Sequence, residues 1–378
     1  MQVAQVILRD THNIPAELSP LVELRPDLLL VFASAELLKT AAPLLAAAFP
    51  ESRRIGCSTA GEISAAGVTD GTCVVTAVRF DKTQLVEAAT QLSSMDDSHD
   101  AGQRLAEMLP REGLRAVLVF GQGVQINGSA LLAGMCAVLG DELPITGGLA
   151  GDGAAFQQTW VLSESGAGSD TIVALGMYGE NLVFGHGSFG GWSPFGPARK
   201  VTHSVGNILY ALDGQPALEV YKRYLGDHAK DLPASGLLFP FAMIGKDHDD
   251  VGLIRTILGV DEQGGSLTLA GEIDPEGYLK LMHASTDALV DGAEVAAEAA
   301  QAMFTGSGKG LALLVSCVGR KLVMGGRVEE EVEAVAEVFG QGALLAGFYS
   351  YGEISPFTSG VACKLHNQTM TISYFDET

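Results

Sequence analysis

The hydrophobic pattern near the N-terminus predicts a strand–helix–strand–strand unit. Residues 27–33 (DLLLVFA) form a continuous apolar run, which is typical of a strand buried on both faces. Residues 35–49 are rich in Ala and Leu and have helical character. Residues 54–61 predict a short strand that enters a turn of small residues, and residues 72–80 (TCVVTAVRF) predict a further strand.

The same order of elements recurs twice. The second copy comprises residues 115–121, 129–139, 144–152 and 171–178, and the third comprises residues 310–317, 329–339, 344–355 and 361–375. Because each unit needs neighbours to cover its apolar faces, three copies predict a duplicated fold. We therefore expect an α/β protein, a two-domain mixed-sheet α/β sandwich built from repeated strand–helix–strand–strand units.

The residues between the second and third copies have a different composition. Residues 184–201 are dense in Gly, Pro and aromatic residues, and residues 207–225 predict a strand, a DG turn and a helix. Prolines bound residues 232–240, which fits a crossing between domains. We place the boundary near residue 230, which gives an N-terminal domain of residues 1–230 and a C-terminal domain of residues 231–378.

Composition and charge narrow the class of protein. The chain has 378 residues, is 47% apolar and carries a formal net charge of −22. Nucleic acid and anionic membranes are therefore poor partners, because phosphate binding depends on clustered Lys and Arg. No apolar run reaches about 18 residues and no signal-peptide pattern is present, so we expect a cytoplasmic protein. The five scattered cysteines, with no CxxC, argue against a disulfide framework and a structural zinc site.

Common catalytic templates are missing from the sequence. It contains no GxSxG, no GxxxxGK[ST] and no HExxH motif. Ser64 and Ser355 lie in two GEIS turns, but neither has a His beside it in sequence. We expect that the protein is not an enzyme, with a small-molecule hydrolase or transferase at the GEIS turns as an alternative.

The two GEIS turns place Glu62 and Glu353 at matching points of the first and third units. Each carboxylate could accept hydrogen bonds from an amine or amide ligand, or it could receive backbone N–H bonds that hold its own turn. His366 lies in KLHNQTM beside Asn367 and Gln368, which can both donate and accept hydrogen bonds. A hydrogen-bonded structural role and a ligand contact both fit this cluster.

One histidine has surroundings that suit a haem. His186 lies in FGHGSFGGW, close to Trp192 and Phe195, and neutral imidazole with an apolar wall can bind haem iron. Arg199 could pair with a propionate carboxylate, and His203 is a weaker candidate for the iron ligand. A loop histidine under an aromatic cap is the alternative. The acidic run at residues 329–333 (EEEVE) is interpreted as the solvated face of a helix.

Four motifs together resemble the FIST family, with both its N-terminal and C-terminal domains. They are GCSTAGEIS at residues 56–64, GGWSPFGPARKVT at 190–202, LDGQPALEVYKRYLG at 212–226, and GFYSYGEISPF with LHNQTMT between residues 347 and 371. The resemblance implies an intracellular sensory protein that acts on a separate signalling protein.

The form of these motifs is most similar to the nitric-oxide-sensing haemoprotein branch called NosP. That resemblance implies haem b as cofactor, His186 as its metal ligand, Trp192 and Phe195 along the pocket, and regulation of a partner histidine kinase or cyclic-di-GMP protein. The alternative is a sensor of a small polar metabolite such as an amino acid, without haem, held by Glu62, Glu353, His366 and Asn367.

Overall fold

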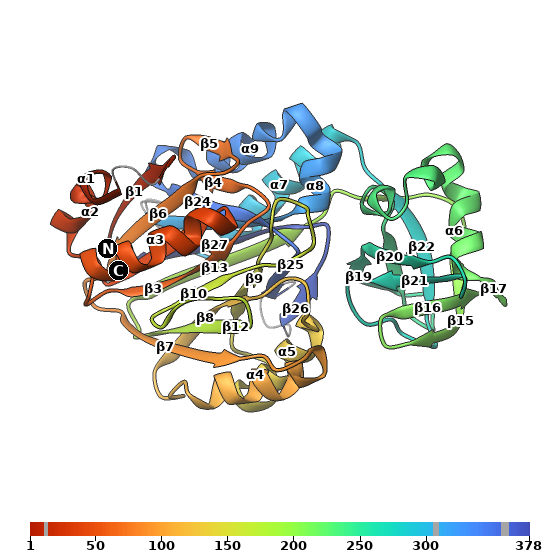
Figure 1. The fold of residues 1–378 in the computed structure, drawn as a ribbon, viewed down its shortest axis with the longest axis horizontal. Helices are drawn as coiled ribbons and strands as arrows, with labels where there is room; N and C mark the ends of the chain where they lie inside the picture. The colour runs from red at the N-terminus through yellow and green to blue at the C-terminus, as the bar shows by residue number, and fades with distance from the viewer. Residues whose placement is uncertain (11–13, 305–309, 357–362) are drawn as a thin grey trace.

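The computed structural model describes residues 1–378 except 11–13, 305–309 and 357–362, and leaves out the side chains of residues 15, 250 and 341. A large body carries a smaller lobe at one side (Figure 1). The body is formed by the chain up to β13 (Leu182–Phe189) and again from α7 (Thr286–Gln301) onwards, and the lobe by the segment between them.

Three repeated units build the body. The first contains β1 (Gln2–Leu8), α1 (Ile14–Glu17), α2 (Ser19–Leu24), β2 (Leu28–Ala33), α3 (Ala35–Ala48), β3 (Arg53–Ser58), β4 (Glu62–Ser64), β5 (Gly67–Thr69) and β6 (Cys73–Arg79). The second contains β7 (Gln84–Gln91), α4 (Ser98–Glu107), β8 (Leu114–Gly121), α5 (Gly128–Leu139), β9 (Ile145–Leu149), β10 (Val161–Ser163), β11 (Gly166–Gly168) and β12 (Thr171–Tyr178).

The third unit begins with β13 and resumes after the lobe. It contains α7, β23 (Leu311–Cys317), α8 (Val318–Met324), α9 (Glu329–Phe339), β24 (Leu344–Ser350), β25 (Gly352–Pro356), β26 (Cys363–His366) and β27 (Met370–Glu377). The predicted mixed α/β fold with repeated units is confirmed. Of the strand predicted from residue 361, the first two residues lie outside the described part.

Each unit contributes four strands to its own sheet and a hairpin to another. In the described residues the sheet orders are β1-β6-β2-β3-β10-β11, β7-β12-β8-β9-β25-β26 and β13-β27-β23-β24-β4-β5. The first unit thus gives its hairpin to the third sheet, the second to the first sheet and the third to the second sheet. This cyclic exchange ties the three units together, because backbone hydrogen bonds join each hairpin to the sheet of another unit.

Three glycines mark the same point in the three units. Gly56, Gly147 and Gly347 each stand opposite the neighbouring parallel strand, in register with Val31, Val119 and Leu314. A Cβ atom on these glycines would lie 1.8, 2.0 and 1.9 Å from the carbonyl oxygens of those three residues. Only glycine allows this close approach of the two strands.

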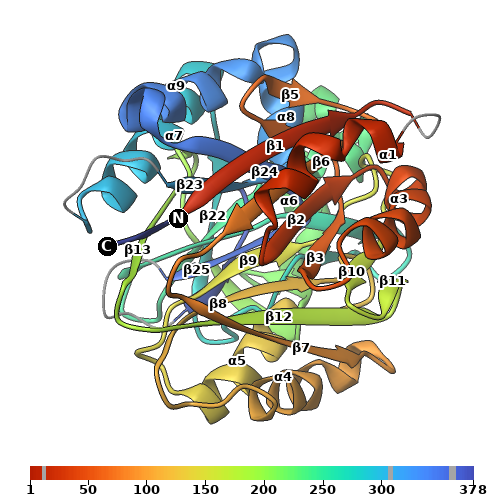
Figure 2. The same ribbon diagram turned by 90° about the vertical axis from the view of Figure 1, so that its left-hand side faces the viewer.

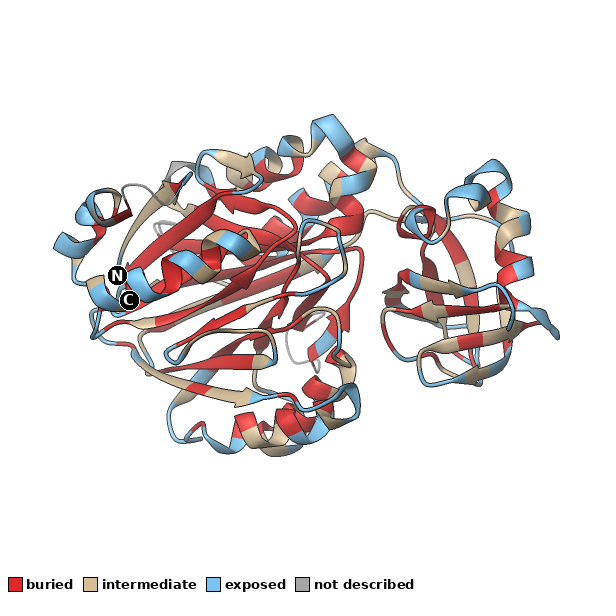
Figure 3. Ribbon diagram, in the orientation of Figure 1, coloured by how far each residue is buried: buried red, intermediate tan, exposed pale blue. Residues whose placement is uncertain are grey.

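The three sheets share one hydrophobic core. Phe32 from β2, Phe120 from β8 and Phe348 from β24 meet at its centre, with ring centroids 4.7–5.9 Å apart. Helices cover the outer faces: α3 the first sheet, α4 and α5 the second, α7 and α9 the third (Figure 2). The central strands are buried and the helices expose one side (Figure 3), as amphipathic helices do.

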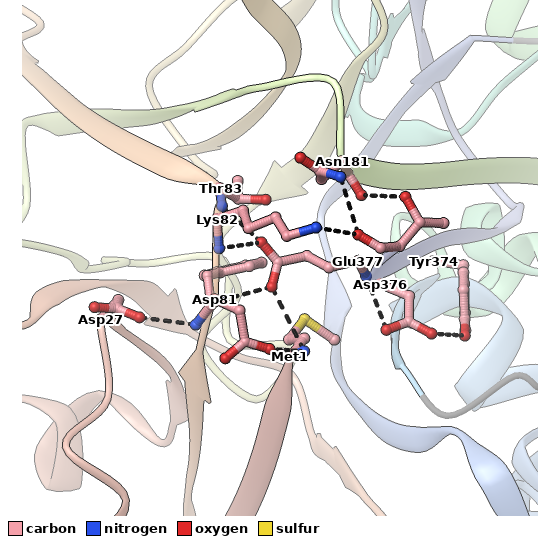
Figure 4. A network of polar contacts seen from close by, with 11 residues as sticks. Met1, Asp27, Asp81, Lys82, Thr83, Asn181, Tyr374, Asp376 and Glu377 are labelled. Atoms are coloured by element: carbon pink, nitrogen blue, oxygen red, sulfur yellow. Dashed lines mark hydrogen bonds and ion pairs between the residues drawn. The ribbon is translucent and has the colours of Figure 1, made fainter.

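Polar contacts hold the edge where the units meet (Figure 4). The carboxylate of Glu377, at the end of β27, accepts hydrogen bonds from the backbone N–H groups of Asp81, Lys82 and Thr83 at 2.6, 2.9 and 2.6 Å. Burial opposes ionisation, but these donors hold the pKa of Glu377 down at about 2. The third unit is thereby fixed to the connection between the first and second.

The lobe has a hydrophobic core of its own. Its strands are β14 (Ser193–Pro194), β15 (Arg199–Val205), β16 (Ile208–Leu212), β17 (Gln215–Pro216), β18 (Phe241–Ile244), β19 (Asp250–Arg255), β20 (Ile257–Asp261), β21 (Ser266–Leu269) and β22 (Tyr278–His283), with helix α6 (Ala217–Leu225). The boundary predicted near residue 230 falls inside the lobe, where β15 pairs with β22 across it. No described helix is long and apolar enough to cross a membrane.

Candidate ligand site around His186

His186 lies on β13, where it pairs with Ser373 of β27, and its side chain lines a cavity of about 630 Å³. Apolar residues from several segments of the chain line this cavity, together with the charged Arg115 and Glu142. Phe184 lies next to it with a ring-centroid distance of 5.9 Å, and the Met303 sulfur accepts the backbone N–H of His186 at 3.3 Å. The lining also includes Leu114, Arg115, Leu139, Glu142, Leu143, Pro144, Leu182, Val183, Phe304 and Pro356.

The imidazole of His186 is buried, with 5% of its surface exposed. Burial lowers its pKa, so the ring is neutral near pH 7. Its Nδ1 atom is buried and has no hydrogen-bond partner among the described residues. A buried polar atom without a partner is unusual in a folded protein and calls for an explanation. Phe304 and Pro356 are the last residues before two undescribed segments, so the lining is that of the described residues.

The other residues predicted around the haem lie elsewhere. Trp192 lies beyond the end of β13, and its indole N–H donates to the carbonyl oxygen of Gln368 at 2.7 Å. Phe195 packs in the lobe against Phe239 and His283. The Arg199 guanidinium bonds Tyr224 and Asp213 on the lobe surface. None of the three lines the cavity of His186, because the glycine-rich segment after β13 carries them out of the body and into the lobe.

His203, the weaker candidate, is exposed on β15 of the lobe. Its ring stacks on Tyr210 with a centroid distance of 4.6 Å. Within the described residues, no group of three or more His, Cys, Asp or Glu side chains could hold a metal ion.

Glu62 and Glu353 are both buried in their turns. Glu62 accepts hydrogen bonds from the Thr59 hydroxyl at 2.5 Å and from the backbone N–H and hydroxyl of Thr72 at 2.9 and 2.8 Å. Burial raises its pKa despite these donors. Glu62 also lines a cavity of about 640 Å³ with Asp70 and Lys321, where both signs of charge are present.

Glu353 accepts from the Ser350 hydroxyl at 2.6 Å and from the backbone N–H and hydroxyl of Thr369 at 3.1 and 3.0 Å. It is fully buried, and burial raises its pKa to about 8. The bonds show that this carboxylate holds its own hairpin, whatever else it contacts.

The cluster at residues 366–368 joins the body to the lobe. His366 Nε2 lies 2.9 Å from the carbonyl oxygen of Ser355, and burial lowers its pKa to about 4. The side chain of Gln368 donates to the Leu237 carbonyl oxygen at 2.9 Å and to the Thr256 hydroxyl at 3.1 Å, both in the lobe. Asn367, 1% exposed, has a side-chain oxygen without a partner among the described residues.

One buried ion pair was missed by the sequence interpretation. Glu331, in the acidic run expected to be solvated, is fully buried and pairs with the fully buried Arg320 at 2.8 Å. Its other oxygen accepts from the hydroxyls of Ser316 and Tyr349 at 3.0 and 2.7 Å. The prediction was wrong for this residue because Glu331 falls on the apolar stripe of α9, between Val328 and Val335, and faces β23 and β24.

Two domain families match this chain. It matches the FIST N domain over residues 27–215 and the FIST C domain over residues 217–356. An uncharacterized protein of Methanocaldococcus jannaschii is 33% identical over 99 residues, which are 25% of this chain and only 18% of that protein.

Solved structures give weaker matches. A cyanuric acid hydrolase has a TM-score of 0.34 at 11% identity, over 100% of this chain and 99% of that one. The cyanuric acid hydrolase of A. caulinodans has a TM-score of 0.34 at 10% identity, over 100% of this chain and 98% of that one. TM-scores this low do not relate the functions of these proteins.

Proposed function

Because the chain belongs to the FIST family, whose domains are associated with signalling and sensing proteins, we propose that it is a haem-binding sensor of nitric oxide. In this proposal haem b is held at His186, and the protein regulates a separate histidine kinase or cyclic-di-GMP signalling protein. The observation that carries the proposal is the buried, neutral imidazole of His186 facing a cavity of about 630 Å³.

The residues present around this cavity fit a haem. The volume lies in the range of small-molecule sites, roughly 300–1,000 Å³. A haem needs only one protein nitrogen for its iron, and the neutral ring of His186 offers one. Leu182, Phe184 and Phe304 supply an apolar wall, and the exposed Arg115 at the mouth can pair with a propionate carboxylate.

When bound, the haem supplies the iron that binds a diatomic gas. The chain's own contribution is to orient His186 on β13 and to place the apolar side chains of Phe184 and Phe304 beside it. Trp192, Phe195 and Arg199 then have another role than lining the haem pocket. They belong to the connection that leads from β13 into the lobe and to the lobe itself, so a displacement of β13 would be passed to the lobe through Trp192 and its bond to Gln368.

Nitric oxide binding tests the sensing step. We expect nitric oxide to change the absorption of the ferrous haem protein and the amide hydrogen exchange of residues 182–196. His203→Ala, on the exposed side of the lobe, serves as the matched control and should respond like the wild type. Unchanged exchange in this segment at saturating nitric oxide would contradict the route from His186 to the lobe.

A sensor of an amino-acid-like metabolite is the second candidate. It is favoured by the cavity at Glu62, which is also lined by an ion pair between Asp70 and Lys321. In this candidate a zwitterion opens the pair, with its ammonium group on the carboxylates of Asp70 and Glu62 and its carboxylate on Lys321. Glu353, His366 and Asn367 do not line this cavity. A concentration-dependent rise in melting temperature with an amino acid, lost in Lys321→Met, would support this candidate. Flat responses to all amino acids would count against it.

A further inference from the structure

A second cavity, of about 800 Å³, lies between the body and the lobe and is lined in part by the guanidinium of Arg255. Arg255, the last residue of β19, is 4% exposed. Its Nε donates to the carbonyl oxygen of Glu272, and its Nη1 donates to those of Ile254 and Leu365, each at 3.2 Å. Within the described residues, no carboxylate lies within 4 Å of this guanidinium.

Arg320 shows how the same protein compensates a buried guanidinium. It is fully buried and forms an ion pair of 2.8 Å with the equally buried Glu331. A buried charge without such a partner is costly, since carbonyl dipoles replace only part of its hydration. Burial accordingly lowers the pKa of Arg255 to about 10, while the more distant carboxylate of Glu272 acts in the opposite direction. The side chain stays protonated at pH 7, and among the described residues it forms no ion pair within 4 Å.

The cavity beside Arg255 has a mainly apolar wall and a charged rim. Its wall includes Leu132 and Ala133 of α5, and Met243, Leu253 and Ile273 of the lobe. Lys364 of β26 adds a second cation, and Asp141, Glu272 and Asp274 add acids, of which Asp141 and Glu272 are exposed. A ligand with one negative group can reach Arg255, whereas a second negative group would meet the acidic rim.

We propose that this cavity binds a small monocarboxylate with a short apolar body. The carboxylate pairs with the guanidinium of Arg255 and the apolar body lies against Leu132, Met243 and Ile273. Charge-assisted hydrogen bonds from a planar guanidinium suit a carboxylate in particular. Because Arg255 belongs to the lobe and Leu132 to the body, an occupant contacts both and holds them together.

Arg54 provides the matched control. It is 8% exposed, and among the described residues its guanidinium donates only to the carbonyl oxygens of Phe49 and Ser52, at 2.7 and 2.8 Å. It lines none of the five cavities described around the body and the lobe. Hydrogen bonds from a guanidinium to carbonyl oxygens therefore do not by themselves make a ligand site. Arg255 differs from Arg54 because a cavity lies next to it.

Calorimetric titration with sodium butyrate at constant ionic strength tests the proposal on the full chain prepared without haem. We expect saturable binding to the wild type and to Arg54→Lys. Arg255→Lys keeps the charge but loses the planar fork, and we expect its affinity to fall about tenfold or more. Phosphate and succinate, tested in parallel, should bind at least about tenfold more weakly than butyrate, because of the acidic rim.

A second variant covers the case in which Arg255→Lys fails to fold. Ala133 is exposed on α5, so Ala133→Trp fills the cavity from the surface and should abolish butyrate binding while keeping the wild-type melting temperature. No heat of binding with wild-type protein would overturn the proposal, as would equal affinity in Ala133→Trp. Tighter binding of phosphate than of butyrate would overturn the carboxylate assignment. Because the protein carries no haem in this experiment, its outcome is independent of the proposal for His186.

Discussion

Glu353 occupies in the third unit the position that Glu62 occupies in the first. Each glutamate lies at the start of a hairpin and accepts a hydrogen bond from a hydroxyl three residues earlier. Its carboxylate also accepts a hydrogen bond from the backbone N–H of a threonine that follows the end of the hairpin. In the second unit, Val161 stands at this position in the hairpin register. The fold can therefore close this hairpin without a carboxylate, and the first and third units use one as an added polar anchor.

Glu353 should make the protein less stable at higher pH. Its pKa is about 8 in the fold, above the ordinary value of 4.5, so the folded protein binds the extra proton. This contribution to the free energy of unfolding is full below about pH 4.5 and is lost as the pH rises through about 8. In Glu353→Gln the amide can donate to Ser350 and accept from Thr369, so we expect a smaller loss of stability between pH 5 and 8 than in the wild type.

Urea unfolding at pH 5 and pH 8 measures this difference. Glu353→Ala leaves the Thr369 donors unsatisfied and should lose about 2 kcal/mol at pH 5, where the Gln variant stays close to the wild type. An equal decrease in the wild type and in Glu353→Gln would show that Glu353 does not cause the pH dependence.

Gly347 is required by the close approach of β23 and β24. In Gly347→Ala the new Cβ would lie 1.9 Å from the Leu314 carbonyl oxygen, so the strands must separate. We expect a loss of about 3 kcal/mol in the free energy of unfolding. Gly326→Ala is the control, because nothing lies within 4 Å of its Cβ position, and it should change stability by less than about 0.5 kcal/mol. Similar effects of the two changes would contradict this account of the strand spacing.

Gln368 should control how firmly the lobe is held. The variant Gln368→Asn tolerates the positive φ of 64° at this position but is too short to reach Leu237 and Thr256. Hydrogen exchange around residues 234–238 and 254–257 should become about tenfold faster, which corresponds to roughly 1.4 kcal/mol. Gln158→Ala, an exposed position on the body, should leave exchange unchanged. Wild-type exchange in Gln368→Asn would mean that other contacts hold the lobe.

The sequence reveals the repeated units but not how they exchange hairpins. Apolar runs predict β2, β8 and β23 because those strands are buried on both faces. Which sheet receives β4 and β5 depends on contacts with Phe348 and Gly347, which are about 285 residues away along the chain. Such pairing leaves no periodic signal in the hairpin itself.

The environment of His186 was only partly visible in the sequence. Neighbours in sequence, Trp192 and Phe195, were expected to surround it, but the chain leaves the body directly after β13. The residues that do surround it, such as Met303 and Leu143, come from distant segments of the chain. The burial of Glu331 was also not visible in the sequence. It lies in a run of acidic residues, yet its side chain faces the core and pairs with Arg320.

The absorption spectrum of protein purified after expression with a supply of haem tests the central claim most directly. The account predicts a Soret band in the wild type and in His203→Ala. The band should be lost or shifted in His186→Ala, with an unchanged melting temperature before haem is added. No Soret band in the wild type, or an identical band in His186→Ala, would contradict the assignment of His186 as the haem ligand.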